Sequence, residues 1–427
     1  MKRSYKVIKD YGENLASFQP NARLYLMNVV LSGAASGVFR LLFNFFVLSL
    51  GYNKEFLGNM VSVSSFTALL AALPMGYVVD WMGRKRALLI SGLFVAVATL
   101  TMTLLPYRGV LLGMNILLGL AQSLAGVTMG PFLMENSTER ERTYLFSFSS
   151  GLMMASGFVG NWVGGYLPTW MGAWRGFDAV STQAYAMALL VVVSVMILAI
   201  VPLFFLKKPR LEAGQSTDFM PLSYFKKEAS LLTRLILPML LTSVGAGLIM
   251  PFMNVFFREI HSLSDAAVGS MFAWGSLAMG LGLMIAPPLA ERMGKIELVV
   301  ITQGMSIPFL FLLGFSPWFG VSAGAYYIRL ALMNMSGPVY QTFVMERVEP
   351  NARATVASLV SMANSVGWAF SPTISGWIQM KYGFGPAFVG TIILYIFSVY
   401  FYWRYFWYQP KQKVENVTGS ETTATGD

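Results

Sequence analysis

Two arginines, Arg40 and Arg329, lie deep inside long runs of apolar residues. Each is about ten residues from the nearer end of its run, a depth of ~15 Å if the run is helical. A charge at that depth in a bilayer costs free energy, so such a residue usually belongs to a functional site. All twenty acidic residues lie at or beyond the ends of the runs, which leaves an anionic group of a bound molecule as the simplest partner. The alternatives are main-chain carbonyl groups, amides such as Asn44, or a position at the wall of the protein.

Amide side chains inside the same kind of run could orient a polar solute by hydrogen bonds. Amides also hold helices together in membranes, and the sequence alone does not separate the two roles. With the two arginines they make up the predicted substrate-binding set. The amide candidates are Asn44, Asn115, Gln122, Asn254, Asn334 and Gln341.

The composition excludes most metal and catalytic chemistry. The chain has no cysteine, which excludes disulfides and thiolate metal sites. It has one histidine, His261, which removes most histidine-based metal and catalytic schemes. The G-x-x-x-x-G-K-[ST] phosphate loop and the serine-hydrolase and zinc-protease motifs do not occur in the sequence. We therefore expect no enzyme activity, no metal and no cofactor.

The elements that must position these side chains are long and apolar. Hydrophobic residues make up 56% of the chain and charged residues 12%, about half the charged share of an average soluble domain. A helix of about 20 residues crosses a bilayer, whereas a barrel strand needs only ~10. The sequence therefore predicts an all-α membrane protein with twelve transmembrane helices. The predicted spans are 24–50, 55–79, 87–106, 109–134, 143–168, 182–206, 231–258, 265–290, 296–316, 320–344, 354–380 and 386–408.

Basic residues are unevenly distributed between the two sides of the predicted bilayer. With the N-terminus inside, the inner segments carry 23 of the 30 Lys and Arg residues and the outer segments carry five. The positive-inside rule then predicts a multi-pass protein of the plasma membrane with both termini in the cytoplasm. The same distribution explains the net charge of +10 without a nucleic-acid partner.

The chain repeats itself at an offset of 211 residues. Met82-Gly83 recurs as Met293-Gly294, and Glu135 recurs as Glu346. Two parallel six-helix halves are a known transporter plan, so the sequence predicts two pseudo-symmetric six-helix bundles. The predicted segments are a cytoplasmic N-terminal segment 1–23, an N-terminal bundle 24–206, a cytoplasmic linker 207–230, a C-terminal bundle 231–409 and a disordered cytoplasmic tail 410–427.

A charged loop follows the second predicted span. Residues 76–86 read GYVVDWMGRKR, and this pattern, G-x-x-x-D-x-x-G-R-K-R, resembles the hallmark loop between helices 2 and 3 of the major facilitator superfamily. Trp81 departs from the basic residue often found there. A degenerate copy, ERMGK at 291–295, stands at the matching place of the second half, with Pro287 in place of the glycine. The resemblance covers about residues 24–408 and implies that family's fold of two six-helix bundles.

The resemblance implies that this loop belongs to a conformational latch that holds the cytoplasmic side closed while the outer side is open. A carboxylate that pairs with arginine in only one conformation favours that conformation. We also expect Gly76, one turn before Asp80, to allow close approach of a neighbouring helix. Solvated loop charges are the alternative interpretation. The predicted latch residues are Gly76, Asp80, Gly83, Arg84, Lys85, Arg86, Glu135, Arg142, Glu291, Gly294, Lys295, Glu346 and Arg353.

The resemblance also implies that helices 1, 4, 7 and 10 line a central cavity, which Arg40 and Arg329 would face from opposite halves. We expect secondary transport of a small solute, most simply an organic anion, by alternating access. The alternative is a proton-coupled exporter of amphipathic drugs or lipids, which suits the 28 Met and 14% aromatic residues. Two signatures of drug antiporters are incomplete, because Asn115 replaces an arginine and residues 160–165 (GNWVGG) lack a proline.

The expected partners follow from this interpretation. They are the small-molecule substrate, the lipid bilayer, and a coupling proton where a proton gradient drives transport. We expect the functional unit to be a monomer.

Overall fold

The structure is a computed structural model that describes residues 18–207, 228–348 and 353–408. The predicted N-terminal segment up to residue 17, most of the predicted linker and the predicted tail lie outside these ranges. Within the described ranges the secondary structure is helical and contains no strand, which confirms the all-α prediction. The long helices are α2 (Pro20–Ser49), α3 (Lys54–Met82), α4 (Arg84–Leu104), α5 (Arg108–Glu135), α6 (Glu139–Arg175), α7 (Thr182–Phe204), α9 (Ala229–Ile249), α10 (Met253–Ile260), α11 (Asp265–Met293), α12 (Lys295–Phe315), α13 (Phe319–Arg347), α14 (Arg353–Tyr382) and α15 (Gly385–Tyr402).

Each predicted span corresponds to one of these helices, except that the seventh is broken. A short 3-10 turn, Met250–Phe252, separates α9 from α10. Among the described residues, nine helical segments are long and apolar enough to cross a membrane. The other three long helices, α6, α13 and α14, are less apolar. Helices α6 and α14 join the two halves, and α13 carries the buried Arg329.

Helices α3 and α11 begin and end alike, as the repeat predicts. Asn53 and Ser264 stand 211 residues apart, and each side chain accepts a hydrogen bond from the main-chain N–H three residues on, at 2.9 and 3.3 Å. Both helices end at a glycine with positive φ, 85° at Gly83 and 98° at Gly294. A side chain would strain that backbone conformation, whereas glycine adopts it readily. The chain then turns directly into α4 and α12.

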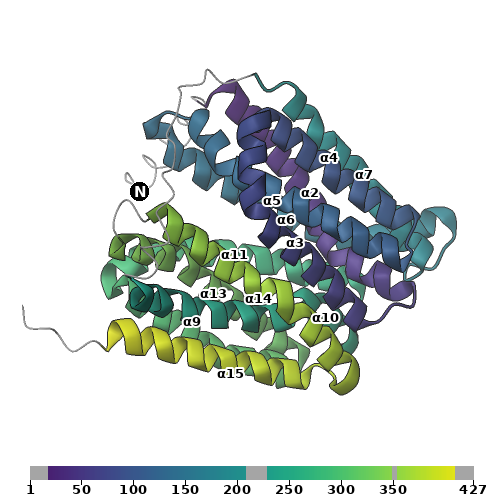
Figure 1. Cartoon of the computed structure of the whole chain (residues 1–427). Coiled ribbons are helices and arrows are strands. Elements are labelled where there is room, and N and C mark those ends of the chain that lie inside the picture. The colour runs from purple at the N-terminus through teal and green to yellow at the C-terminus, as the bar shows by residue number, and fades with distance from the viewer. Residues whose placement is uncertain (1–17, 208–227, 349–352, 409–427) are drawn as a thin grey trace, which may run out of the picture.

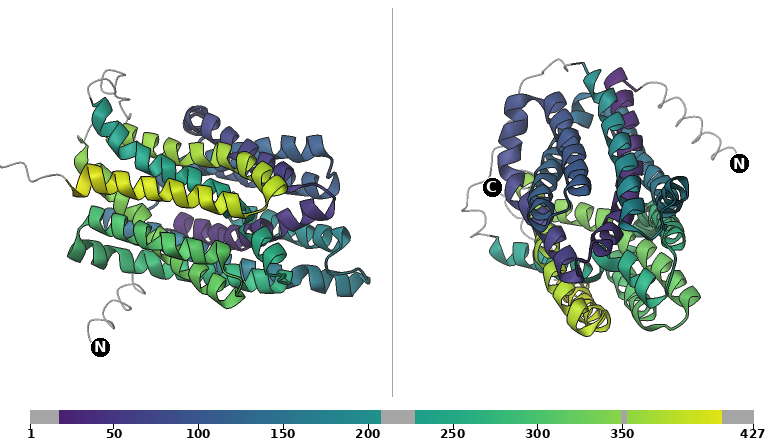
Figure 2. Two further views of the ribbon diagram at one scale, coloured as in Figure 1. Left: turned by 90° about the horizontal axis from the view of Figure 1, so that it is seen from below. Right: turned by 90° about the vertical axis from the view of Figure 1, so that its right-hand side faces the viewer.

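The helices form two six-helix bundles with matching internal neighbours (Figure 1). In the first half, α2 packs against α6 and α7, while α5 packs against α3 and α4. In the second half, α9 packs against α14 and α15, while α13 packs against α11 and α12. Figure 2 shows the same two bundles from below and from the side. The duplication in sequence is therefore a duplication in structure.

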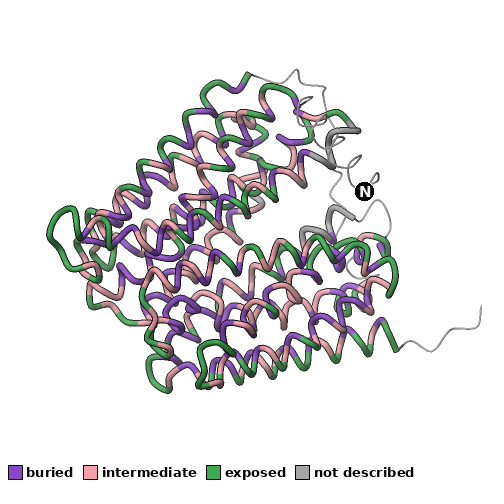
Figure 3. Tube along the Cα trace, turned by 180° about the vertical axis from the view of Figure 1, so that it is seen from behind, coloured by how far each residue is buried: buried purple, intermediate pink, exposed green. Residues whose placement is uncertain are grey.

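The halves join through two helix pairs, α3 with α14 and α6 with α11, which the repeat relates to each other. The two halves meet at one end of the protein and diverge at the other (Figures 1 and 3). The diverging end holds Gly83 and Gly294, and we call it the basic end. The joined end holds Asn53 and Ser264, and we call it the opposite end.

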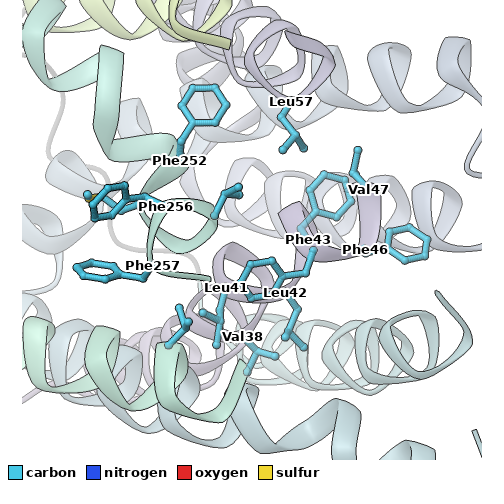
Figure 4. Close-up of a cluster of buried hydrophobic side chains, with 14 of the residues drawn as sticks. Val38, Leu41, Leu42, Phe43, Phe46, Val47, Leu57, Phe252, Phe256 and Phe257 are labelled. Carbon is cyan, nitrogen blue, oxygen red and sulfur yellow. The ribbon is translucent and has the colours of Figure 1, made fainter. Parts of the chain in front are cut away.

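The buried hydrophobic residues show the same division. The largest cluster draws residues from both halves, among them Leu42 and Phe46 of α2 and Phe256 and Phe257 of α10 (Figure 4). Three smaller clusters lie toward the basic end, and each contains residues of one half alone. Burial of apolar surface is the main favourable term in such contacts. The common core therefore holds the halves together at the opposite end.

One glycine permits an especially close contact between the halves. A Cβ atom on Gly58 of α3 would lie 2.1 Å from the carbonyl oxygen of Pro372 in α14. No side chain fits there, so the two backbones meet without one.

Candidate functional site

Arg329 is fully buried in the second half. Its side chain is 1% exposed, although guanidinium groups are almost never buried without a partner. One terminal nitrogen donates a hydrogen bond to the Tyr395 hydroxyl at 3.1 Å, and the other contacts the Met250 sulfur at 3.5 Å. The Nε–H group has no hydrogen-bond partner. A permanent charge with an unpaired donor is thus held next to the break between α9 and α10.

Arg40 approaches the same region from the first half. Its side chain is exposed to solvent, and its Nε contacts the carbonyl oxygen of Ser36 on its own helix at 3.4 Å. Tyr326, one turn before Arg329 on α13, is buried in the second half. The two arginines belong to opposite halves, and Asn44, one turn after Arg40, donates to the carbonyl of Pro251, which adjoins the Met250 that Arg329 contacts.

Neither arginine contacts a carboxylate among the described residues. The ion pairs there involve Lys54, Arg84, Arg258 and Lys295, all near helix ends. Two positive charges at a low-dielectric site attract an anion more strongly than they would in water. Arginine also suits carboxylate and phosphate groups, because its planar fork can donate two parallel hydrogen bonds.

Two of the predicted amides lie beside the arginines and bind each other across the halves. Asn44 Nδ2 donates to the Asn254 side-chain oxygen at 3.0 Å and to the Pro251 carbonyl oxygen at 2.9 Å. Asn254 Nδ2 donates in return to the Leu41 carbonyl oxygen at 2.9 Å. We call these four groups the amide clasp.

The other four amides are placed differently. Asn115 is buried and donates to the Leu111 carbonyl oxygen at 2.8 Å on its own helix, with Met102 of α4 beside it. Asn334 likewise bonds to its own helix, while Gln122 and Gln341 are exposed. The structure therefore gathers Arg40, Asn44, Asn254 and Arg329, and assigns Asn115 to the contact between α4 and α5.

Sequence reasoning missed two tyrosines of this group. Tyr326 precedes Arg329 by three residues, so helical spacing could have indicated a shared face. Tyr395 is 66 residues from Arg329, and no local pattern distinguishes it from the other tyrosines.

At the basic end, the described ion pairs lie within single halves. Arg84 contacts Asp80 at 2.6 Å and Glu135 at 3.3 Å, and Lys295 pairs with Glu346 at the equivalent place. The partners in both Arg84–Glu135 and Lys295–Glu346 are 51 residues apart, so the two halves repeat one arrangement.

Other predicted latch residues have separate roles or none here. Lys85 donates two hydrogen bonds of 2.6 Å to the carbonyl oxygens of Phe204 and Leu206, which terminate α7. Arg86 and Glu291 are exposed. Outside its own helix, no atom of the described residues lies within 4 Å of a Cβ built on Gly76, so the expected close approach of a neighbouring helix is not found among them in this conformation. The side chains of Arg142 and Arg353 lie outside the described residues.

At the opposite end, charged and aromatic groups link the halves. Lys54 of α3 pairs with Glu259 of α10 at 2.5 Å. The Tyr185 hydroxyl of α7 donates to Asp265 of α11, whose carboxylate also lies 3.6 Å from Arg258. The sequence had placed Asp265 simply at a span end. The Lys54–Glu259 pair and the Tyr185–Asp265 bond cross between the halves and support closure there, whereas Arg258 and Asp265 belong to the same half.

His261 lies in the loop between α10 and α11. Its ring packs against Phe256 and Phe257, and burial lowers the pKa of its imidazole below the ordinary value. It is therefore neutral at pH 7 and adds no charge to the closed end.

Comparison with known proteins identifies the family to which this chain belongs. The sequence profile of the Major Facilitator Superfamily matches residues 25–372 and, in a second alignment, 235–425. The chain belongs to the Major Facilitator Superfamily. This confirms the resemblance seen in the loop at residues 76–86 and the fold of twelve transmembrane helices in two bundles.

Solved structures of this superfamily share the fold at low sequence identity. A bacterial homologue of the human lysosomal transporter Spinster, in an inward-facing and unoccupied conformation, superposes with a TM-score of 0.72 at 13% identity, covering 92% of this chain and 96% of that one. The nucleoside transporter NupG, as a D323A mutant, gives 0.72 at 14% identity over 90% and 98%. The D-xylose–proton symporter gives 0.68 at 15% identity over 90% and 97%.

Curated relatives match only part of their length. The galactose–proton symporter of Escherichia coli K12 is 24% identical over 310 residues, which is 65% of this chain and 65% of the symporter. The Bacillus subtilis protein YwtG is 29% identical over 160 residues, 37% of this chain and 35% of that protein. The chain thus spans less than two thirds of the length of these curated relatives, and its membership of the superfamily together with its long apolar helices indicates a multi-pass membrane protein.

Proposed function

We propose that this chain is a secondary transporter that carries a small organic anion by alternating access. The observation that carries the proposal is the buried guanidinium group of Arg329, which has an unpaired donor and no carboxylate partner in the described chain. Keeping such a charge away from water costs free energy, and a transported anion would recover part of that cost at each binding event.

Binding would begin from the basic end, where the halves diverge. Arg40 is the accessible member of the pair, and Arg329 is the buried one. An anion that contacts both would place negative charge between the two halves and draw them together. Rocking of the halves about the site would then close the basic end and open the opposite end. The solute supplies the difference in binding free energy that shifts the two conformations.

The basic-end charges would serve as the latch of the other conformation. In the present conformation Arg84 and Lys295 contact acids of their own halves. We propose that closing the basic end brings Asp80, Glu135 and Glu346 against basic residues of the other half. Gly83 and Gly294 fix the turns that hold these charges at the helix ends.

The source of energy would be a gradient, since the sequence has no phosphate loop. Two of the compared proteins are named as proton symporters, which supports adding a coupling proton to the proposal. Asp265 is a buried carboxyl group that could bind one, because it is 10% exposed between Tyr185 and Arg258.

The proposed location is the plasma membrane, with the basic end and both termini in the cytoplasm. The uneven distribution of basic residues supports this orientation. The chain lacks cysteine, so a single introduced cysteine reports its own side. An impermeant maleimide added to intact cells should label Tyr382→Cys at the opposite end and leave Trp81→Cys unlabelled until the membrane is permeabilised. The reverse pattern would contradict the orientation.

The substrate proposal is tested by flux. Purified protein in liposomes should take up members of a panel of labelled carboxylates and phosphate esters, and Arg40→Gln and Arg329→Gln should each lower uptake about 10- to 100-fold. This range corresponds to loss of about 1.5–3 kcal/mol for hydrogen bonds to a charged group. Arg108→Gln is the matched control, because Arg108 stands at the start of α5, where its guanidinium group lies 5.5 Å from the centre of the Phe56 ring. Uptake unchanged in both site variants would discard the anion site.

A further inference from the structure

The amide clasp contains polar groups whose hydrogen bonds depend on the conformation. Asn254 is 3% exposed, and its amide donates to the first half. The Asn44 amide donates to the second half twice. A buried amide or carbonyl group without a partner costs about 1–3 kcal/mol. The Asn254 oxygen also accepts from the Val255 N–H at 3.0 Å, and the Leu41 carbonyl lies inside helix α2, so both keep a partner when the halves separate. The two side-chain NH2 groups instead lose the cross-half acceptors given above and need new ones.

The clasp is connected to both arginines by short paths. Asn44 follows Arg40 by four residues on α2, which places the two side chains on one helix face. Pro251 follows Met250 directly, and the Met250 sulfur contacts Arg329. The clasp carbonyl of Pro251 lies in the 3-10 turn, where α9 ends and its hydrogen-bond ladder is interrupted. A group bound at the arginines would therefore adjoin both sides of the clasp.

The clasp also lies where the joined region begins. Leu41 and Leu42 beside it belong to the hydrophobic cluster shared by both halves (Figure 4). Beyond it, toward the opposite end, are the Lys54–Glu259 pair and the Tyr185–Asp265 bond. The clasp is thus the polar boundary between the arginine region and the closed end.

We propose that the amide clasp is the gate that closes the arginine site toward the opposite end, and that a bound solute takes over its hydrogen bonds when the gate opens. The anionic part of this inference rests on the proposed function, whereas the gate does not. Opening frees the NH2 groups of Asn44 and Asn254, and it frees one acceptor position on each of the Leu41 and Pro251 carbonyl oxygens. Hydroxyl groups both donate and accept hydrogen bonds, so they match this mixed set. The substrate class is therefore a hydroxylated organic anion, such as a sugar acid or a sugar phosphate.

The gate is tested without any substrate. Spin labels at Val180→Cys and Tyr382→Cys, exposed positions of the two halves at the opposite end, report the distance between the halves by pulsed electron resonance. Asn44→Leu and Asn254→Leu keep the side-chain shape and remove the hydrogen bonds. Each should raise the ratio of long to short distances about five- to tenfold, within the usual range of coupling between sites.

Asn115→Leu is the matched control. It removes a buried amide that bonds to its own helix, so its distance distribution should equal that of the parent. If a leucine variant does not fold, Asn44→Ser and Asn254→Ser replace it, since serine is too short to span the contact. If the Asn44 and Asn254 variants gave the same distribution of spin-label distances as the parent protein, the proposal that the amide clasp is a gate would be wrong.

Flux then tests the solute contacts. Each hydroxylated anion of the panel is paired with its deoxy counterpart, for example gluconate with hexanoate. Asn44→Leu should lower uptake of the hydroxylated member about tenfold toward that of its counterpart. An equal loss for both members would overturn the hydroxyl contacts. If no anion is transported by the parent protein, the proposed function fails, while the distance measurement still decides the gate.

Discussion

Gly58→Ala is expected to lower transport about 5- to 150-fold while leaving each half folded. The added methyl group would lie 2.1 Å from the Pro372 carbonyl oxygen across the contact between the halves. Overpacking a close contact costs about 1–3 kcal/mol. The halves can relieve that cost by separating at the opposite end, so the conformation described here loses population. The Val180 and Tyr382 spin labels should then show predominantly long distances.

Gly160 provides the comparison. A Cβ there would lie 2.1 Å from the Ala34 carbonyl oxygen, the same clash, but between α2 and α6 inside one half. Rocking cannot relieve it, so Gly160→Ala should lower the thermal unfolding midpoint instead. Gly76→Ala, where the methyl group meets nothing within 4 Å, should leave the spin-label distances unchanged. Equal loss of stability in Gly58→Ala and Gly160→Ala would show that the α3–α14 contact is not one that opens.

Arg329→Met is expected to make the protein more stable and to abolish anion uptake. Arg329 is buried without a carboxylate partner and with one N–H donor unpaired. Replacing it with an apolar side chain of similar length removes the free-energy cost of keeping this charge away from water. Scales of membrane insertion put an arginine at the helix centre at about +2.5–3.5 kcal/mol. A gain of about 1–3 kcal/mol after loss of the Tyr395 hydrogen bond should raise the thermal unfolding midpoint by several degrees.

Arg258→Met should have the opposite effect on stability. Arg258 lies 3.6 Å from Asp265, and its removal leaves that buried carboxylate with one partner fewer. If Arg329 only stabilised the fold, Arg329→Met would lower the thermal unfolding midpoint, as Arg258→Met is expected to do. A lower unfolding midpoint for Arg329→Met, with uptake retained, would therefore contradict a binding role for Arg329.

Much of the fold follows from local sequence properties. Span length, the turn glycines Gly83 and Gly294 and the caps Asn53 and Ser264 depend on nearby residues, and the repeat shows each of them twice. The sequence also singled out Arg329, because a charge in an apolar run is visible without tertiary information. Its partner Tyr395 is not, since one tyrosine among nineteen carries no local signal.

Other parts of the site depend on which helix ends adjoin and which conformation is present. Lys85 looked like a latch charge, but its ammonium group terminates α7, a contact set by tertiary packing. Asn44 and Asn254 looked like separate ligands of a solute, yet they bond to each other here. A sequence with two conformations encodes both sets of partners. The substrate class, the latch and the direction of transport stay predictions for the same reason.

The repeat does not extend to the charges at the centre. At the offset of 211 residues, Arg40 corresponds to Pro251, and Arg329 corresponds to Leu118. A duplicated scaffold thus encloses an unduplicated pair of cations, one on the first helix of its half and the other on the fourth. A solute with one charged end would bind these arginines in a single orientation. It would contact different residues when it enters from one side of the membrane than when it enters from the other. Its affinity need not be equal on the two faces of the bilayer, so the concentration that half-saturates the carrier can differ between the two sides, while the gradients of the solutes set the net direction.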